Sequence, residues 1–405
     1  MLGFHGSAAL LPRFIDAWHL SATEAGWLLG TMSLVALLAS PAIALTDRVD
    51  ARWVMAAGTA FNVAGYGGFG LLADGLPSAL VFRGLMGIGF ALSYTTGIKA
   101  IGDRVPADRQ ARVTSTYVSS FSICSSLSVV IAGTVAGAFD WRWAYAVPAV
   151  TNLVAGLMLV FALPSASRRP APADAGAGGT RPAAPKLFDF GAIAGNRAAL
   201  GFVAGGFAHT AELLAMRGWT VAFLTFVATL HPGSAPAWNL PLVATMLILT
   251  GVPSGIAGGA LGTRFGLARV SFIVMLTSAA IEAVVGFAAS WPYWLFFFGP
   301  LLLQNIMVMG DAGTLSAGVM SRADPSRRGS TVAFYTMATS VGSFVGPVLF
   351  GVVLDATGGR QSAPAWGFAF ASIGVVSLAS ALALARLTGV GPDRAAGAPE
   401  AAPRR

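Results

Sequence analysis

The sequence predicts an all-α protein that crosses a membrane many times. Of its 405 residues, 55% are hydrophobic and only 10% are charged, whereas about a quarter of the residues in a soluble globular domain are charged. Long apolar runs recur along the whole chain, and the two halves of the chain match each other at a nearly fixed offset. Lipid therefore replaces water as the solvent around most of the protein.

Eleven apolar segments approach the length of about 20 residues that a helix needs to cross a bilayer. They are 24–45, 52–72, 78–101, 113–139, 143–163, 198–230, 240–261, 268–290, 291–320, 331–354 and 365–387. The stretch 1–14 is apolar but too short to cross, so it predicts half of a first helix. By the internal repeat, the start of the seventh helix corresponds to positions before Met1, so we expect a misplaced start codon; a genuinely shortened first helix is the alternative.

Basic residues gather in one of the two sets of loops between these segments. Fifteen Lys and Arg residues fall in that set, and the opposite loops hold only Arg13, Arg142 and Arg360. The positive-inside rule makes the richer side cytoplasmic, and the C-terminal tail falls on it. The formal net charge of +8 is then explained without nucleic acid, and we expect a multi-pass protein of a bacterial-type inner membrane with a cytoplasmic C-terminus.

A segment rich in Pro, Ala and Gly divides the chain into two halves. We predict an N-terminal bundle over 1–163, a flexible cytoplasmic linker over 164–190, a C-terminal bundle over 191–389 and a cytoplasmic tail over 390–405. The halves match at several positions, for example Arg109 with Arg327. Internal duplication of this kind is typical of transporter folds.

Two loops at equivalent places in the repeat carry related basic motifs. The loop over 45–52 holds Asp47, Arg48 and Arg52, and the loop over 258–269 holds Arg264 and Arg269. Both resemble the signature of the major facilitator superfamily, and this resemblance covers essentially the whole chain. It implies two six-helix bundles, about twelve helices in all, that rock around a central cavity.

The resemblance also implies roles for these loops and departs from the family pattern in places. Asp47 would pair with basic residues and helix ends at a cytoplasmic gate. Asp50 stands where the family usually has glycine, and Thr263 replaces the acid of the second copy, so the gating charge is weaker there. An ordinary turn with positive-inside arginines is the alternative for each motif taken alone.

The fourth helix carries an arginine followed by two glycines that allow close helix approach. Arg83, Gly87 and Gly89 resemble the conserved-arginine helix of the same superfamily. An arginine about one turn inside the boundary is costly unless it faces a partner or a wet cavity, so Arg83 is a candidate functional residue. The alternative is that its long side chain reaches the outer surface.

The deepest polar cluster lies on the seventh helix. His209 and Glu212 are three residues apart and share a face, whereas Arg217 points elsewhere and needs a partner on another helix. An ionisable group at mid-membrane is a functional hypothesis by default, so either residue of the pair could couple transport to protons. A purely structural lock between helices is the alternative.

The tenth and eleventh helices add two further groups of candidates. Gln304, Asn305 and Asp311 could line a cavity from the C-terminal half, although Asp311 could equally pair with a cytoplasmic arginine. In the eleventh helix, small residues and a proline provide a smooth surface that can kink. These packing or hinge residues are Gly342, Gly346, Pro347 and Gly351.

The sequence thus predicts a secondary transporter and not an enzyme. We expect alternating access, protons as the coupling ion and a small organic solute. Arg83 and Arg217 would make the outer cavity attractive to negative charge and so favour an anionic solute. The alternatives are a multidrug or metabolite efflux antiporter and a non-transporting membrane sensor. We expect a monomer in the lipid bilayer, with no cofactor, no nucleic acid and no metal site, because no His or Cys cluster has metal-ligand spacing.

Overall fold

The computed structural model describes residues 2–47, 49–164, 195–234, 239–324 and 328–390. The predicted linker over 164–190 and the tail over 390–405 lie almost entirely outside these residues. The helices of the first half are α1 (Gly6–Ala9), α2 (Leu11–Ala17), α3 (Ala22–Ala39), η1 (Ser40–Asp47), α4 (Ala51–Leu72), α5 (Leu76–Phe90), η2 (Ala91–Thr95), α6 (Thr96–Arg104), α7 (Ala107–Ala138) and α8 (Trp141–Phe161).

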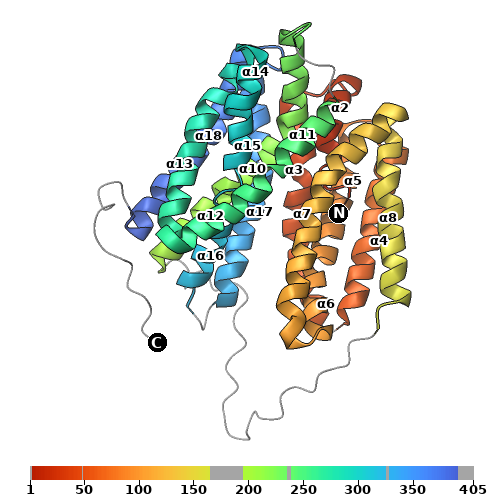
Figure 1. Cartoon of the computed structure of the whole chain (residues 1–405). Coiled ribbons are helices and arrows are strands. Elements are labelled where there is room, and N and C mark those ends of the chain that lie inside the picture. The colour runs from red at the N-terminus through yellow and green to blue at the C-terminus, as the bar shows by residue number, and fades with distance from the viewer. Residues whose placement is uncertain (1, 48, 165–194, 235–238, 325–327, 391–405) are drawn as a thin grey trace, which may run out of the picture. The chain divides into compact units, whose positions relative to one another are not determined.

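The second half is helical in the same way (Figure 1). Its helices are α10 (Arg197–Leu230), α11 (Leu240–Leu249), α12 (Gly251–Phe265), α13 (Leu267–Val285), η3 (Phe287–Ser290), α14 (Tyr293–Phe296), η4 (Phe297–Leu301), α15 (Leu302–Met307), α16 (Ala312–Arg322), α17 (Arg328–Ala356) and α18 (Ala363–Thr388). The predicted all-α fold is confirmed, and each of the eleven predicted spans coincides with one long helix or with consecutive helical segments.

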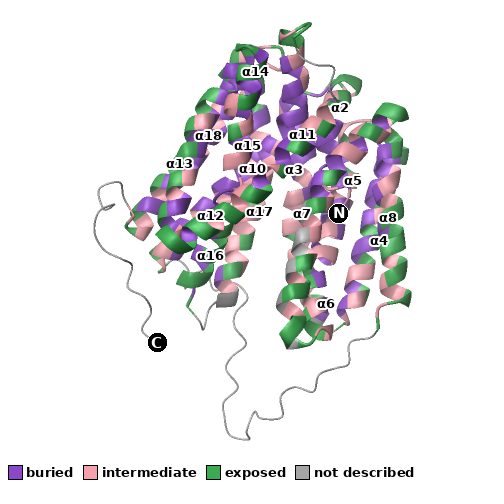
Figure 2. Cartoon of the chain, in the orientation of Figure 1, coloured by how far each residue is buried: buried purple, intermediate pink, exposed green. Residues whose placement is uncertain are grey.

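The outer surfaces of these helices are apolar. Nine helical spans in the described part of the chain are long and apolar enough to cross a membrane, and α4 and α7 are also long. Large side chains such as Leu71, Phe161 and Ile256 are 80%, 82% and 71% exposed. Figure 2 shows exposed positions along the outward sides of the helices and buried positions within each group. Lipid is the solvent in which such a surface is stable.

The chain forms two compact units. Unit 1 comprises 1–6 and 31–187, and unit 2 comprises 7–30 and 188–405. In unit 1, α4 packs along α8 and α5, and α7 packs against α8. Close approach depends on small residues, because a Cβ at Gly87 would meet the backbone of the helix that holds Met32 and Ala36.

In unit 2, α10 is the central helix. It packs against α17, α18 and α16, while α13 packs against α18. A group of stacked and edge-on aromatic rings fills one part of the interior, including Trp219 of α10, Phe350 of α17 and Trp366 of α18. This packing fixes the face of α10 that carries its polar residues.

Candidate functional site

Glu212 lies at the centre of a hydrogen-bonded network inside unit 2. Its side chain is buried on α10 and receives three hydrogen bonds from three other helices. Ser278 Oγ of α13 and Gln304 Nε2 of α15 donate to Oε1 over 2.5 Å and 2.8 Å, and Ser377 Oγ of α18 donates to Oε2 over 2.9 Å. Every one of these donors is a neutral group.

His209 forms a second buried polar contact one turn earlier on α10. Its Nδ1 lies 2.8 Å from Asp311 Oδ1, and both side chains are buried. In the described structure the partner of Asp311 is thus His209, whereas the sequence allows a cytoplasmic arginine equally well. Because His209 and Glu212 share a face of α10, the pair and the Glu212 network adjoin and interact electrostatically.

Two of the predicted candidates contribute less directly. Arg217 Nη2 lies 3.8 Å from the sulfur of Met309, so its contact on another segment is a thioether and not a carboxylate. Asn305 of α15 is buried, and its Nδ2 donates to the carbonyl of Leu301 at the end of η4 over 3.0 Å. The structure therefore brings together His209, Glu212, Gln304 and Asp311 of the predicted set.

Arg83 is buried in unit 1 on α5. It is 3% exposed, so its side chain does not reach the surface of this unit. Its Nη1 lies 3.6 Å from the sulfur of Met32, and its charge interacts with the phenols of Tyr145 and Tyr66. Gly89, two turns away on the same helix, leaves room for Asn62 of α4.

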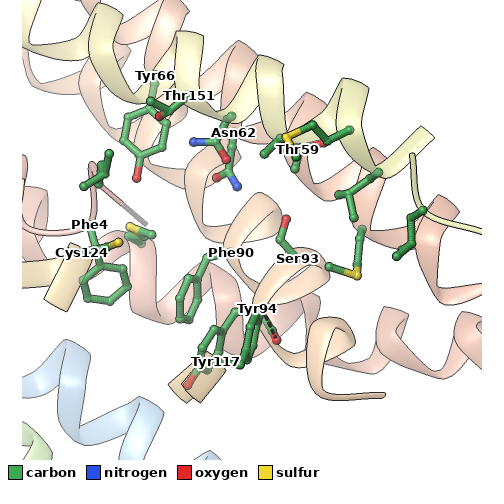
Figure 3. A pocket seen from close by; sticks show the side chains of 18 of the residues that line it. Phe4, Thr59, Asn62, Tyr66, Phe90, Ser93, Tyr94, Tyr117, Cys124 and Thr151 are labelled. Atoms are coloured by element: carbon green, nitrogen blue, oxygen red, sulfur yellow. Dashed lines mark hydrogen bonds between the residues drawn. The ribbon is translucent and has the colours of Figure 1, made fainter. Parts of the chain in front are cut away.

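Unit 1 also contains a cavity of about 560 Å³, a volume within the range of small-molecule sites. Figure 3 shows its polar side chains on α4 and α8 facing aromatic side chains on α5, η2 and α7. All side chains that line it are uncharged. They are Leu2, Phe4, Met32, Met55, Thr59, Asn62, Tyr66, Phe90, Ser93, Tyr94, Tyr117, Cys124, Thr151, Asn152, Ala155, Met158, Leu159, Ala162 and Leu163.

The aromatic wall of the cavity is ordered by stacking and one hydrogen bond. The rings of Tyr94 and Tyr117 stack with centroids 5.5 Å apart, and Phe90 stacks on Tyr94 at 5.3 Å. Tyr117 Oη donates to the carbonyl oxygen of Tyr94 over 3.0 Å. Tyr94 lies in η2, a π-helical turn, and such turns often occur at functional sites because they change the direction of side chains.

Comparison with known proteins identifies the family. The family model described as the Major Facilitator Superfamily matches residues 1–234, more than half of the chain. The chain belongs to the major facilitator superfamily. A search of curated protein sequences gives no significant match.

Solved structures of this superfamily share the fold. A bacterial homologue of the human lysosomal transporter Spinster, inward-facing and occupied, gives a TM-score of 0.70 at 16% identity and covers 96% of this chain and 92% of its own. The nucleoside transporter NupG gives 0.68 at 15%, with 95% and 96% covered. The D-xylose-proton symporter gives 0.73 at 13%, with 97% and 96% covered.

The superfamily's signature loop contains an ion pair that differs from the expected one. Asp50, the departure from the family glycine, caps α4 by accepting a hydrogen bond from the Arg52 amide and forms an ion pair with Arg104 Nη2 at 2.5 Å. The side chain of Asp47 and all of Arg48 lie outside the described residues, so their predicted roles stay predictions. In the second loop, the Arg264 guanidinium lies over the ring of Phe265 at 5.0 Å, and the gate role of Arg264 and Arg269 also stays a prediction.

The sequence did not predict several residues of the Glu212 network and of the cavity in unit 1. Ser278 and Ser377 bind Glu212, but serine is so common at helix contacts in membranes that neither stood out. Asn62 and Tyr94 of the cavity were also missed. Both are uncharged, and an uncharged residue in an apolar segment does not stand out in the sequence as a charged one does. Within the described residues, no group of three or more His, Cys, Asp or Glu is placed to hold a metal ion.

Proposed function

We propose that the chain moves a small, neutral organic solute across a membrane by alternating access, coupled to protons. Membership of the superfamily supports transport, and the arrangement around Glu212 is the observation that supports proton coupling. The cavity of unit 1 supports the class of solute.

Proton coupling requires a group that can gain and lose a proton within the protein. Glu212 is bound only by neutral donors, so taking up a proton would not break an ion pair. A buried carboxylate is costly unless it is paired or hydrogen-bonded, and the three donors keep that cost moderate. Glu212 can therefore gain and lose a proton during a transport cycle. The adjoining His209 and Asp311 are a second pair of groups through which a proton could pass.

The lining of the cavity supports a neutral solute. Neither Arg83 nor Arg217 lines it, so the reason for expecting an anion does not apply there. The aromatic rings of Phe90, Tyr94 and Tyr117 offer a stacking surface, and Asn62 and Asn152 offer amide donors and acceptors. A solute with a planar or apolar part and a few hydrogen-bonding groups suits this combination.

The sequence supports a proposal for the membrane and its orientation, whereas it leaves the direction of transport open. The distribution of basic residues favours a bacterial-type inner membrane with the C-terminus in the cytoplasm. We propose uptake as the direction, with efflux by antiport as the alternative. The two produce opposite changes in the solute content of vesicles under the same pH gradient.

Uptake into proteoliposomes tests this function. Purified protein is reconstituted, an inward proton gradient is imposed, and entry of radiolabelled uridine and D-xylose is measured as representative neutral probes, alongside benzoate as an anionic probe. We expect gradient-driven entry of a neutral probe, and we expect Glu212→Gln to lose at least nine-tenths of it, because the amide cannot take up a proton.

A matched control separates the charge of Glu212 from a general effect of the substitution. Glu24 accepts hydrogen bonds from Ser21 at the start of α3, and Glu24→Gln removes the same charge outside the buried cluster. This variant should transport as the wild type does. Gradient-driven entry that persists in Glu212→Gln would remove this residue from the coupling mechanism, and benzoate entry alone would contradict the neutral solute.

A further inference from the structure

Glu282 is the most deeply buried acidic side chain that the network around Glu212 does not use. It lies on α13 with an exposed fraction of 0%. It faces α18, because a Cβ placed on Gly374 of that helix would lie 3.2 Å from the Glu282 Cβ and 3.6 Å from its Oε2. Ser278, which binds Glu212, is one turn away on the same helix.

The carboxyl group of Glu282 receives no hydrogen bond. In the described part of the chain, neither Oε1 nor Oε2 has a hydrogen-bond partner, and the same is true of Gln304 Oε1 nearby in the network. A buried carboxylate anion without donors is far more costly than the neutral acid. Its surroundings therefore suit a carboxyl that carries a proton.

The charged groups on the neighbouring helices do not compensate for Glu282. The group that interacts with it electrostatically is Glu212, another acid. Of the residues on α10, His209 pairs with Asp311 and Arg217 contacts Met309. The other charged residues of α13 and of the described helices packed on it lie at helix ends. They are Arg197, Arg264, Arg269, Arg322 and Arg386. Arg269 and Arg386 are 12 or more residues from the contact between Glu282 and Gly374, a distance of about 18 Å along a helix.

We propose that Glu282 and Glu212 form a proton-binding pair in unit 2, with the proton on Glu282 when Glu212 is ionised. Two neighbouring carboxyls in a dry interior cannot both be ionised at low cost. Glu212 has three donors and holds the negative charge, whereas Glu282 has none and holds the proton. The pair thus retains one proton while Glu212 remains able to accept a second from outside the pair.

A proton can also pass from Glu282 to Glu212 in a balanced step. The O–H bond of Glu282 breaks as an O–H bond forms on Glu212, and the negative charge passes to Glu282. Ser278 can then release the neutral Glu212 and turn its hydroxyl toward the new carboxylate, since the two residues are one turn apart on α13. For transport this inference rests on the proposed proton coupling, where it adds a second carboxyl to the path.

Infrared spectroscopy of the protein in lipid tests the pair without any solute. A protonated carboxyl has a C=O stretching band that a carboxylate lacks. At neutral pH in choline chloride we expect the wild type to show this band, and Glu282→Gln to lose the intensity of one carboxyl. Glu24→Gln, which changes an acid outside the pair, should leave the band unchanged.

Several outcomes would overturn the proposal. One is the absence of the band from the wild type at neutral pH. This result would contradict the proposal even if the Glu282→Gln variant did not fold. Another is a band that keeps its full wild-type intensity in both Glu282→Gln and Glu282→Met. Loss of the wild-type band when sodium chloride replaces choline chloride would show that a metal cation, and not a proton, neutralises the pair.

The infrared and transport experiments test the proton-binding pair and the proposed function independently. If the wild type shows no gradient-driven entry of any probe but Glu282→Gln loses the band, the proposed function is wrong and the proton-binding pair stands. If Glu212→Gln loses coupling and the band is insensitive to Glu282, the proposed function stands and the pair is wrong.

Discussion

The contact between His209 and Asp311 is the clearest interaction between ionisable residues in the interior of unit 2. The two side chains are buried and 2.8 Å apart. Removing one member of a buried charged pair leaves the other uncompensated, whereas removing both with apolar replacements of similar size is often neutral. The pair therefore makes a prediction about stability that does not depend on the solute.

We predict that Asp311→Leu alone destabilises the protein by about 3–5 kcal/mol. The double variant His209→Leu with Asp311→Leu should recover most of this loss, because neither member of the pair is then left buried without the other. The thermal midpoint of purified protein in detergent measures both. A double variant no more stable than Asp311→Leu would show that the two residues are not energetically coupled.

The sequence identified His209 and Asp311 as candidates but did not predict that they contact each other. Depth in a membrane helix made His209, Glu212 and Asp311 stand out, since charge is rare there. Helical spacing also put His209 and Glu212 on one face. The identity of partners on other helices depends on rotation and tilt, which the sequence does not encode locally, so Ser278 and Ser377 could not be assigned.

At the scale of helices, α10 and α17 are held together by close backbone contact. A Cβ at Gly346 would fall against the carbonyl of Ala211, and one at Gly342 against the carbonyl of Phe207. The indole Nε1 of Trp219 donates to the carbonyl of Pro347 over 3.1 Å. These glycines are packing residues in the described structure, as small residues often are between membrane helices.

We predict that Gly346→Ala lowers stability by about 1–3 kcal/mol, the range expected when a packed interface is overfilled. Gly137 of α7 is a matched control, because a Cβ there would have nothing within 4 Å. Gly137→Ala should leave the thermal midpoint unchanged or raise it slightly. Equal effects of the two substitutions would contradict the role given to Gly346.

The helices themselves were predictable, but their capping contacts were not. Apolar length alone located the long helices, because the bilayer imposes it. By contrast, Asp355 at the end of α17 accepts hydrogen bonds from the amides of Ala22 and Thr23, at 2.9 Å and 2.7 Å, and so caps the start of α3. Nothing in the pattern of either segment links residues so far apart in the chain.

At the scale of the whole molecule, the duplicated halves have diverged in chemistry. Unit 1 contains a cavity whose lining is uncharged, and unit 2 contains the buried acid Glu212, which is held by neutral donors. The repeat in the sequence predicted two similar folds but not this difference, because it was found from matching positions and the divergent residues are those that do not match. We infer that solute contact and proton binding are divided between the halves.

The steady solute gradient held by a fixed pH gradient tests this account most directly. Proteoliposomes are given pH differences of known size with the membrane potential clamped at zero, and the final ratio of the transported neutral probe inside and outside is measured. Symport of one proton with each neutral solute predicts a ratio that changes about tenfold per pH unit, and no dependence in Glu212→Gln. A wild-type ratio that stays at one for every pH difference would contradict proton-coupled transport.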